Sequence, residues 1–304
     1  MGNHIFAKIG IITIIISLIG CKTKTTLETT HIEPKNSITV NNGNLKKKYQ
    51  QYDEFILKWV SAYKDGDDVG IVNYGTKLAR IAKIEENEVK TFLSEYLKNK
   101  KEDLKPYIYI SLVLAGFTDN CAFIATLEQY LVIEDKELLA NALLGMSKLT
   151  RCNFNLNQVL WLLEHEFDES VILNALQVVL QYNDPLDIAR LEKIIEKFIR
   201  HRNPLITNQS IRLIAKYKIG KFTKVLVNEF LSHPLIFIRT NTAMALSLIG
   251  DRSIIKELID KMNAPSFIGK KETAYVLENL TGQKFGLDAQ AWLFWYIKNF
   301  DTSE

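Results

Sequence analysis

From Leu45 to its C-terminal end, the chain is built of paired apolar segments, each long enough for a helix. The clearest pair covers residues 222–251, and His233-Pro234 separates its two helices. Proline lacks a backbone N–H donor and restricts the residue before it, so the first helix must stop there. Gly250 is expected to end the second helix as a C-cap glycine. The apolar residues of the second helix share one narrow face: Leu235, Ile238, Ala245, Leu246 and Ile249.

The same pattern recurs along the chain at a nearly constant spacing. The steps between successive pairs are thirty to thirty-seven residues, a period typical of helical solenoids rather than closed bundles. Glycine and proline are sparse, with 14 and 6 residues, which also favours helices. The sequence therefore predicts an all-α fold of about six to seven helix pairs. Their second helices are expected to end near Gly116, Leu149, Tyr182, Ile219, Gly250 and Thr281.

The 222–251 unit resembles a HEAT repeat. Its second helix contains Ile238-Arg239, then Ala243, Ala245-Leu246 and Ile249-Gly250-Asp251, which follow the pattern of that family. The resemblance implies a right-handed α-α superhelix of the HEAT or armadillo type over residues 45–304. It also implies that Arg239 bridges neighbouring layers and has a structural role. The other units match only in their period and in the positions of their breaks.

The C-terminal segment is expected to close this superhelix. Gly282 stops one helix, Asp288 can cap the next, and Trp292 and Trp295 follow on neighbouring turns of a helix over 288–300. The segment is similar to one that closes many bacterial HEAT-repeat proteins. Terminal repeats must cover an exposed apolar face, so a structural cap is the preferred interpretation. A tryptophan platform for a ligand is the alternative.

The N-terminal residues contain a short apolar run that ends at a cysteine. Lys8 precedes an apolar run over 9–19, about eleven residues long, whereas a membrane-spanning helix needs about twenty. The run ends in Leu18-Ile19-Gly20-Cys21, which resembles the lipobox of bacterial lipoprotein precursors. The resemblance implies a signal peptide over 1–20 and a lipid-modified Cys21. A short membrane anchor or a buried strand is the alternative.

Residues 21–44 form a polar segment without apolar periodicity, which predicts a disordered tether with a reach of roughly 25–30 Å. Lipidation at Cys21 would place the protein in the cell envelope. Neither aspartate nor an acidic run follows Cys21, so an outer-membrane position facing the periplasm is preferred. The choice of membrane and leaflet stays open.

Two further cysteines, Cys121 and Cys152, lie about one repeat apart. Neighbouring helix starts could bring them together as a disulfide, which an exported protein can keep. Two separate buried thiols are the other interpretation, and the sequence slightly favours it.

The residues offer no pattern typical of catalysis. Glu164-His165-Glu166 lacks the second histidine of a zinc-protease helix, and the phosphate-binding and nucleophile motifs are missing. We therefore expect no enzyme, no cofactor and no metal. The formal charge of +3, which falls by one without Lys8, argues against a nucleic-acid partner.

These features together predict a membrane-tethered interaction scaffold. A protein or peptide partner would bind in the concave groove, and the lipid on Cys21 would hold the scaffold at a membrane. A subunit that assembles into an envelope complex is the first alternative. An enzyme on a HEAT-like fold, as in alkylpurine DNA glycosylases and bilin lyases, is the less favoured one.

Overall fold

The structure is a computed structural model that describes residues 121–149, residues 152–300 and scattered positions between 54 and 78. These residues form helices and turns, and none of them is in a strand. The predicted signal peptide, Cys21, the tether and Gly116, where one second helix is expected to end, lie outside the described residues. The chain forms two compact units, unit 1 over residues 1–159 and unit 2 over residues 160–304.

The best described part of unit 1 is one helix pair. A 3₁₀ turn η2 (Cys121–Phe123), α6 (Ile124–Gln129) and a second 3₁₀ turn η3 (Tyr130–Val132) form its first member, and α7 (Lys136–Met146) is the second. Asp135 caps α7, since its Oδ1 accepts the backbone N–H groups of Glu137 and Leu138 at 3.1 and 3.2 Å. α7 packs against α6 and η3. The next helix, α8 (Asn157–His165), begins in unit 1 and ends in unit 2.

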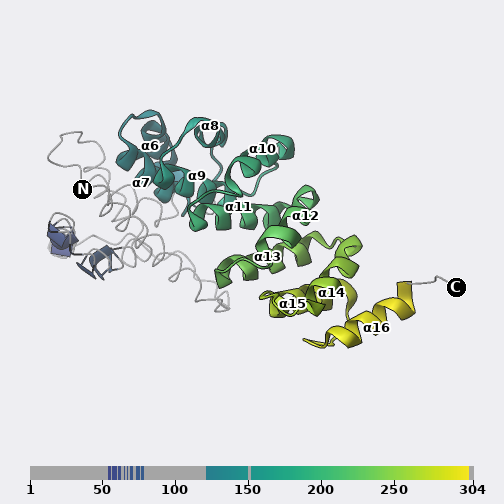
Figure 1. Ribbon diagram of the computed structural model, residues 1–304. Helices are drawn as coiled ribbons and strands as arrows, with labels where there is room; N and C mark the ends of the chain where they lie inside the picture. The colour runs from purple at the N-terminus through teal and green to yellow at the C-terminus, as the bar shows by residue number, and fades with distance from the viewer. Residues whose placement is uncertain are drawn as a thin grey trace, which may run out of the picture. The chain divides into compact units, whose positions relative to one another are not determined.

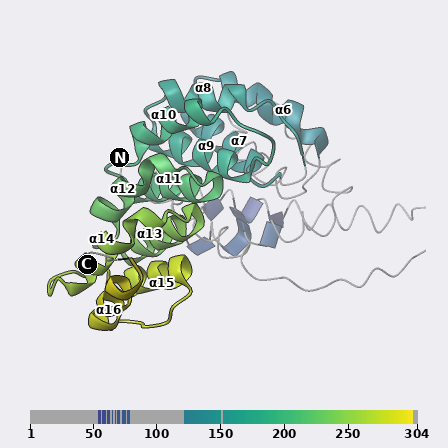
Figure 2. The same ribbon diagram turned by 90° about the vertical axis from the view of Figure 1, so that its right-hand side faces the viewer.

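Unit 2 is a stack of helix pairs in two layers, as Figures 1 and 2 show. The second members, α9, α11, α13 and α15, pack side by side in chain order, while α10 packs on α11 and α14 on α15. The first layer contains α8, α10 (Ile188–Phe198), α12 (Thr223–Val225) with η5 (Leu226–Phe230), and α14 (Ile255–Asn263). The second layer contains α9 (Glu169–Gln181), α11 (Pro204–Tyr217), α13 (Ile236–Ile249) and α15 (Lys270–Thr281).

The helices of the second layer run in the same direction. Midway along α11 and α13, the side chains of Asn208 and Asn241 share a hydrogen bond of 2.7 Å. Just beyond the C-terminal end of α11, a Cβ on Gly220 would lie 3.9 Å from Ile249 at the end of α13. Parallel second helices are what a repeated helix pair requires. The all-α fold of stacked pairs predicted from the sequence is confirmed for the described residues.

Local sequence explains where these helices begin and end. Asp168 caps α9, since it accepts the backbone N–H groups of Ser170 and Val171 at 2.9 and 3.0 Å. Asn203 caps α11 ahead of Pro204. Gly250 and Gly282 close α13 and α15 with φ of 75° and 77°, values that favour glycine. The predicted C-cap role of Gly250 is thus confirmed.

The first helix of the 222–251 pair is less regular than the sequence predicts. It consists of a 3₁₀ turn η4 (Gly220–Phe222), α12 and a π-helical turn η5, and the N–H of Leu231 bonds the carbonyl of Leu226 at 3.1 Å. The wider turn lets Leu226, Phe230 and Leu231 all face the core, where each is buried. A regular α-helix would separate the directions of Leu226 and Leu231 by more than a quarter turn.

The last helix, α16 (Ala289–Phe300), packs on α14 at the C-terminal end of unit 2. Asp288 Oδ1 accepts the backbone N–H groups of Gln290 and Ala291 at 3.1 and 2.9 Å. Trp292 is fully buried, and its Nε1–H donates to the carbonyl of Gly286 at 3.0 Å. Trp295 lies edge-on to Trp292, with ring centroids 6.1 Å apart.

Candidate functional site

The outer face of the first layer is charged, and its charges pair with one another between consecutive repeats. Arg190 on α10 forms two hydrogen bonds of 2.7 and 3.0 Å with Glu164 on α8. Lys221 and Lys224 continue the pattern, reaching Glu196 on α10 at 2.7 Å and Glu257 on α14 at 2.8 Å. Because each of these cations has its own carboxylate, this face offers little net charge to a partner.

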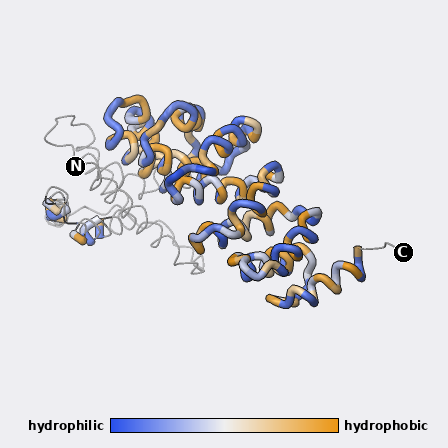
Figure 3. Tube along the Cα trace, in the orientation of Figure 1, coloured by the Kyte–Doolittle hydropathy of each residue, from blue (hydrophilic) through white to orange (hydrophobic). Residues whose placement is uncertain are grey.

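On the outer face of the second layer, large apolar side chains lie exposed on two neighbouring helices, while the first layer exposes Trp161 on α8 and Ile188 on α10. Phe237, Met244 and Leu248 follow one another on the side of α13 opposite its buried residues. Tyr275 occupies the corresponding side of the neighbouring α15. These four side chains, called the apolar strip below, are between 36% and 50% exposed. In Figure 3, apolar stretches of α13 alternate with pale and hydrophilic ones.

Amide side chains join the helices of the second layer alongside the strip. Gln209 on α11 donates to Gln177 on α9 at 2.7 Å, and both side chains are buried. Asn241 on α13 donates to Asn208 on α11 at the same distance. These neutral hydrogen bonds fix how neighbouring second helices lie against each other.

Arg212 lies on α11, one turn beyond Asn208, and its guanidinium is half-buried. Its Nη1–H donates to Gln209 Oε1 at 2.9 Å, and burial lowers the pKa of Arg212 from its ordinary value. The guanidinium stays charged at neutral pH because the ordinary pKa of arginine is so high. Arg212 therefore brings a positive charge to the same face as the apolar strip.

Lys216, one turn further along α11, is held by the protein itself. Its Nζ donates to the carbonyls of Leu180 and Tyr182 at the C-terminal end of α9, the first at 2.8 Å. The hydroxyl of Tyr217 reaches the carbonyl of Tyr182 at 3.2 Å, and burial raises the pKa of Tyr217 to about 12. Both side chains thus satisfy carbonyls that the helix end leaves without partners.

Of the site residues predicted from the sequence, Cys21 lies outside the described residues and the others lie in the last helix and the turn before it. Asp288, Trp292 and Trp295 lie together at the C-terminal end, and the buried Trp292 has no exposed surface on which a ligand could stack. Arg239 reaches from α13 to Glu272 on α15 at 2.9 Å.

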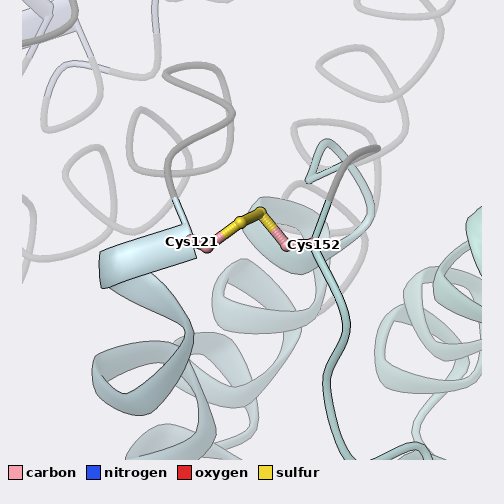
Figure 4. Close-up of a disulfide and its surroundings, with 2 residues drawn as sticks. All are labelled: Cys121 and Cys152. Carbon is pink, nitrogen blue, oxygen red and sulfur yellow. A yellow bond between two sulfur atoms is a disulfide. The ribbon is translucent and has the colours of Figure 1, made fainter.

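Cys121 and Cys152 form a disulfide, with Cα atoms 5.3 Å apart (Figure 4). The slight preference for two separate thiols is therefore wrong. The bond joins the first turn of the α6–α7 pair to the segment that leads into α8. Their separation of 31 residues, one repeat, was the sequence signal for this pairing.

The acidic cluster around His165 serves the fold. Glu164 binds Arg190, and this hydrogen bond lowers the pKa of Glu164. The ring of His165 stacks on Trp161 at 4.6 Å, and Glu166 accepts backbone N–H groups of the turn before α9. Within the described residues, no group of three or more histidine, cysteine, aspartate or glutamate side chains could hold a metal ion.

Sequence reasoning missed the apolar strip and Arg212. The signal was present in α13, where Phe237, Met244 and Leu248 occupy the side of the helix that its buried residues leave to solvent.

Comparisons with known proteins give likenesses to solved structures and none in sequence. No family model matches the sequence, and no curated protein matches it. Among solved structures, a designed armadillo repeat protein aligns with 62% of this chain and 98% of its own. The two are 15% identical in sequence, with a TM-score of 0.46. In the part of the chain that the structure describes, we find no helix with the length and hydropathy of a membrane span.

Proposed function

We propose that this protein is an interaction scaffold of the cell envelope. It binds a protein or peptide partner on the second-layer face of unit 2, and a lipid on Cys21 tethers it to a membrane. The observation that supports binding is the row of exposed apolar side chains on the second-layer face of unit 2. One face carries ion pairs that neutralise each other, and the other exposes Phe237, Met244, Leu248 and Tyr275. Exposed apolar patches of this kind mark interaction surfaces.

The proposal for the envelope depends on two independent features. Leu18-Ile19-Gly20-Cys21 has the composition of a lipobox after a short apolar run. The disulfide between Cys121 and Cys152 suits an oxidising compartment, because cytosolic thiols are kept reduced. The outer membrane, facing the periplasm, remains the preferred address.

Site-specific photocrosslinking in living cells tests the binding face. A photoreactive phenylalanine replaces Tyr275 in the strip or, as a control, the exposed Lys256 on α14 in the other layer. We expect crosslinked partners from position 275 and far fewer from position 256. Equal crosslinking from both positions would contradict the proposed face. A single abundant partner would favour an assembly subunit, and several partners would favour a general scaffold.

Metabolic labelling with a palmitate analogue tests the anchor. The wild type should incorporate the label and sediment with membranes, whereas Cys21→Ala should do neither. Equal labelling of the two proteins would rule out lipidation at Cys21 and leave the binding face to be judged by the crosslinking alone.

A further inference from the structure

Arg212 differs from the other described arginines of unit 2 in what surrounds it. Arg252 is exposed to solvent, and four others pair with a glutamate: Arg190, Arg200, Arg202 and Arg239. Arg212 is half-buried, yet its one hydrogen-bond partner among the described residues is the neutral amide of Gln209. No described carboxylate compensates its charge.

A partly buried guanidinium without a carboxylate partner destabilises the folded state. Burying a charge is unfavourable unless an opposite charge or several hydrogen bonds compensate it. Arginine has five N–H donors in a planar fork, and Gln209 accepts from Nη1. The remaining donors of Arg212 match the two oxygens of a carboxylate, which arginine binds through paired hydrogen bonds.

Arg212 and the apolar strip lie at the same level of the stack. α11 and α13 are parallel neighbours, and the Asn208–Asn241 hydrogen bond sets their register. Arg212 follows Asn208 by one helical turn, and Met244 follows Asn241 by about one turn. Arg212 on α11 is therefore level with Met244 on α13.

We infer that Arg212 and the apolar strip form one site, which binds a peptide segment carrying large apolar side chains and a carboxylate. The inference rests on the proposed function and names its partner class. The apolar side chains of the peptide cover Phe237, Met244, Leu248 and Tyr275. Its carboxylate, from aspartate, glutamate or a free C-terminus, binds the guanidinium of Arg212.

A peptide fits this surface better than a fatty acid does. The strip residues remain more than one third exposed, so they form a shallow surface across α13 and α15. Peptides bind such surfaces through a few side-chain anchors, whereas an acyl chain needs an enclosed cavity to leave water.

The other charges near the strip are compensated, so Arg212 determines which charge a partner should carry. Lys271 and Glu278 lie about one turn before and after Tyr275 on α15, and their charges oppose each other. Lys216 is held by carbonyls of α9, and Glu272 is paired with Arg239. The charge that remains without an opposite partner on this face is positive.

Selection from a random peptide library tests the inference with the full chain in detergent. Displayed peptides of about nine residues suffice, because Phe237 and Leu248 are roughly 17 Å apart along α13. We expect the selected peptides to combine apolar residues with aspartate or glutamate. Replacing that carboxylate by its amide should weaken binding about tenfold or more, as measured by fluorescence anisotropy.

Variants of the protein complete the test as a double-mutant cycle. Arg212→Gln should weaken binding of the acidic peptide and make the acidic and amide peptides equal. Arg212→Lys should restore part of the difference, and the exposed Arg252→Gln should change nothing. Circular dichroism and thermal unfolding verify that each variant is folded.

The outcomes that overturn the inference are distinct from those that overturn the proposed function. Peptides that lose affinity for Met244→Ser but bind equally well in acidic and amide forms would overturn the role of Arg212 and leave the binding face intact. A selection in which no peptide distinguishes the wild type from a folded Met244→Ser variant would overturn both.

Discussion

At the scale of single residues, surroundings decide what an ion pair contributes. The Arg239 and Glu272 side chains are 14% and 11% exposed, and Arg239 also binds the carbonyls of His233 and Pro234. The Arg200 and Glu229 side chains make an ion pair of similar length but are 57% and 42% exposed. Water and salt screen the second pair far more than the first.

Arg239→Ala should therefore destabilise unit 2 by about 3 kcal/mol, since it leaves the carboxylate of Glu272 buried without a cation. Arg200→Ala should cost less than about 1 kcal/mol. Urea unfolding followed by circular dichroism measures both. Similar losses from the two variants would contradict the structural role of Arg239 that the HEAT resemblance implies.

Gly269 lies where the fold leaves no space for a side chain. A Cβ at this position would lie 1.9 Å from the carbonyl oxygen of Leu231, at the end of the π-helical turn, so backbone would have to move. We expect Gly269→Ala to destabilise the protein by about 1–3 kcal/mol. In Gly220→Ala the new methyl group contacts only Ile249, at 3.9 Å. The urea midpoint of this variant should therefore change little.

At the scale of elements, α16 closes the end of unit 2 with one buried side chain. Trp292 is fully buried and hydrogen-bonded to Gly286, whereas Phe294 on the same helix is 71% exposed. The remaining contacts of α16 with unit 2 are made mainly with α14.

Trp292→Ala should cost about 3–5 kcal/mol, because it removes a large buried aromatic side chain. Phe294→Ala should cost less than about 0.5 kcal/mol. Hydrogen exchange should show that α16 loses protection first in Trp292→Ala. Equal protection of α16 in the two variants would show that Trp292 does not hold the cap.

The start of α9 is tied to the start of α11 through Glu169. A hydrogen bond from Asn203 and the nearby Arg202 lower the pKa of Glu169 in the folded protein. A carboxyl group with a lowered folded pKa stabilises the fold above its unfolded pKa of about 4.3, and this contribution is lost as the pH falls through the folded value.

The urea midpoint of unfolding should consequently decrease as the pH is lowered from about 6 to about 3. Glu169→Gln should make this decrease smaller. The reduction is the informative quantity, because other carboxyl groups also titrate in this range. An unchanged pH dependence in Glu169→Gln would show that the link between α9 and α11 does not depend on its charge.

At the scale of the whole molecule, each unit depends on a different kind of link. Unit 1 contains the disulfide between Cys121 and Cys152, and unit 2 relies on packing and hydrogen bonds between repeats. Repeats in a stack contact only their neighbours, so a local change is felt mainly nearby.

Reduction of the disulfide should destabilise the α6–α7 pair by about 2–4 kcal/mol. Dithiothreitol should increase hydrogen exchange in α6 and α7 and leave α11 and α13 unchanged. The Cys121→Ser/Cys152→Ser double variant should show the same exchange with and without the reductant. If reductant had no effect on the wild type, the bond would not stabilise the pair.

The fold class could be predicted from the sequence because successive helix pairs repeat the same pattern of apolar residues, breaks and caps. His233-Pro234, Gly250 and Gly282 mark real boundaries for that reason. The π-helical turn could not be predicted in this way, because it depends on which neighbour covers a side chain. The apolar strip left a signal in the helical spacing of Phe237, Met244 and Leu248, although composition alone does not separate the exposed Phe237 from the buried Ile238.

The ion pairs of the first layer have a consequence for the shape of unit 2 itself. Dissolved salt weakens the links between Arg190 and Glu164 and between Lys224 and Glu257, which lie on one side of the stack. On the other side, the amide pairs are neutral and the Arg239–Glu272 pair is largely buried, so salt weakens these links less. Ionic strength thus acts unequally on the two sides, and we expect the curvature of unit 2 to depend on the medium as well as on the sequence.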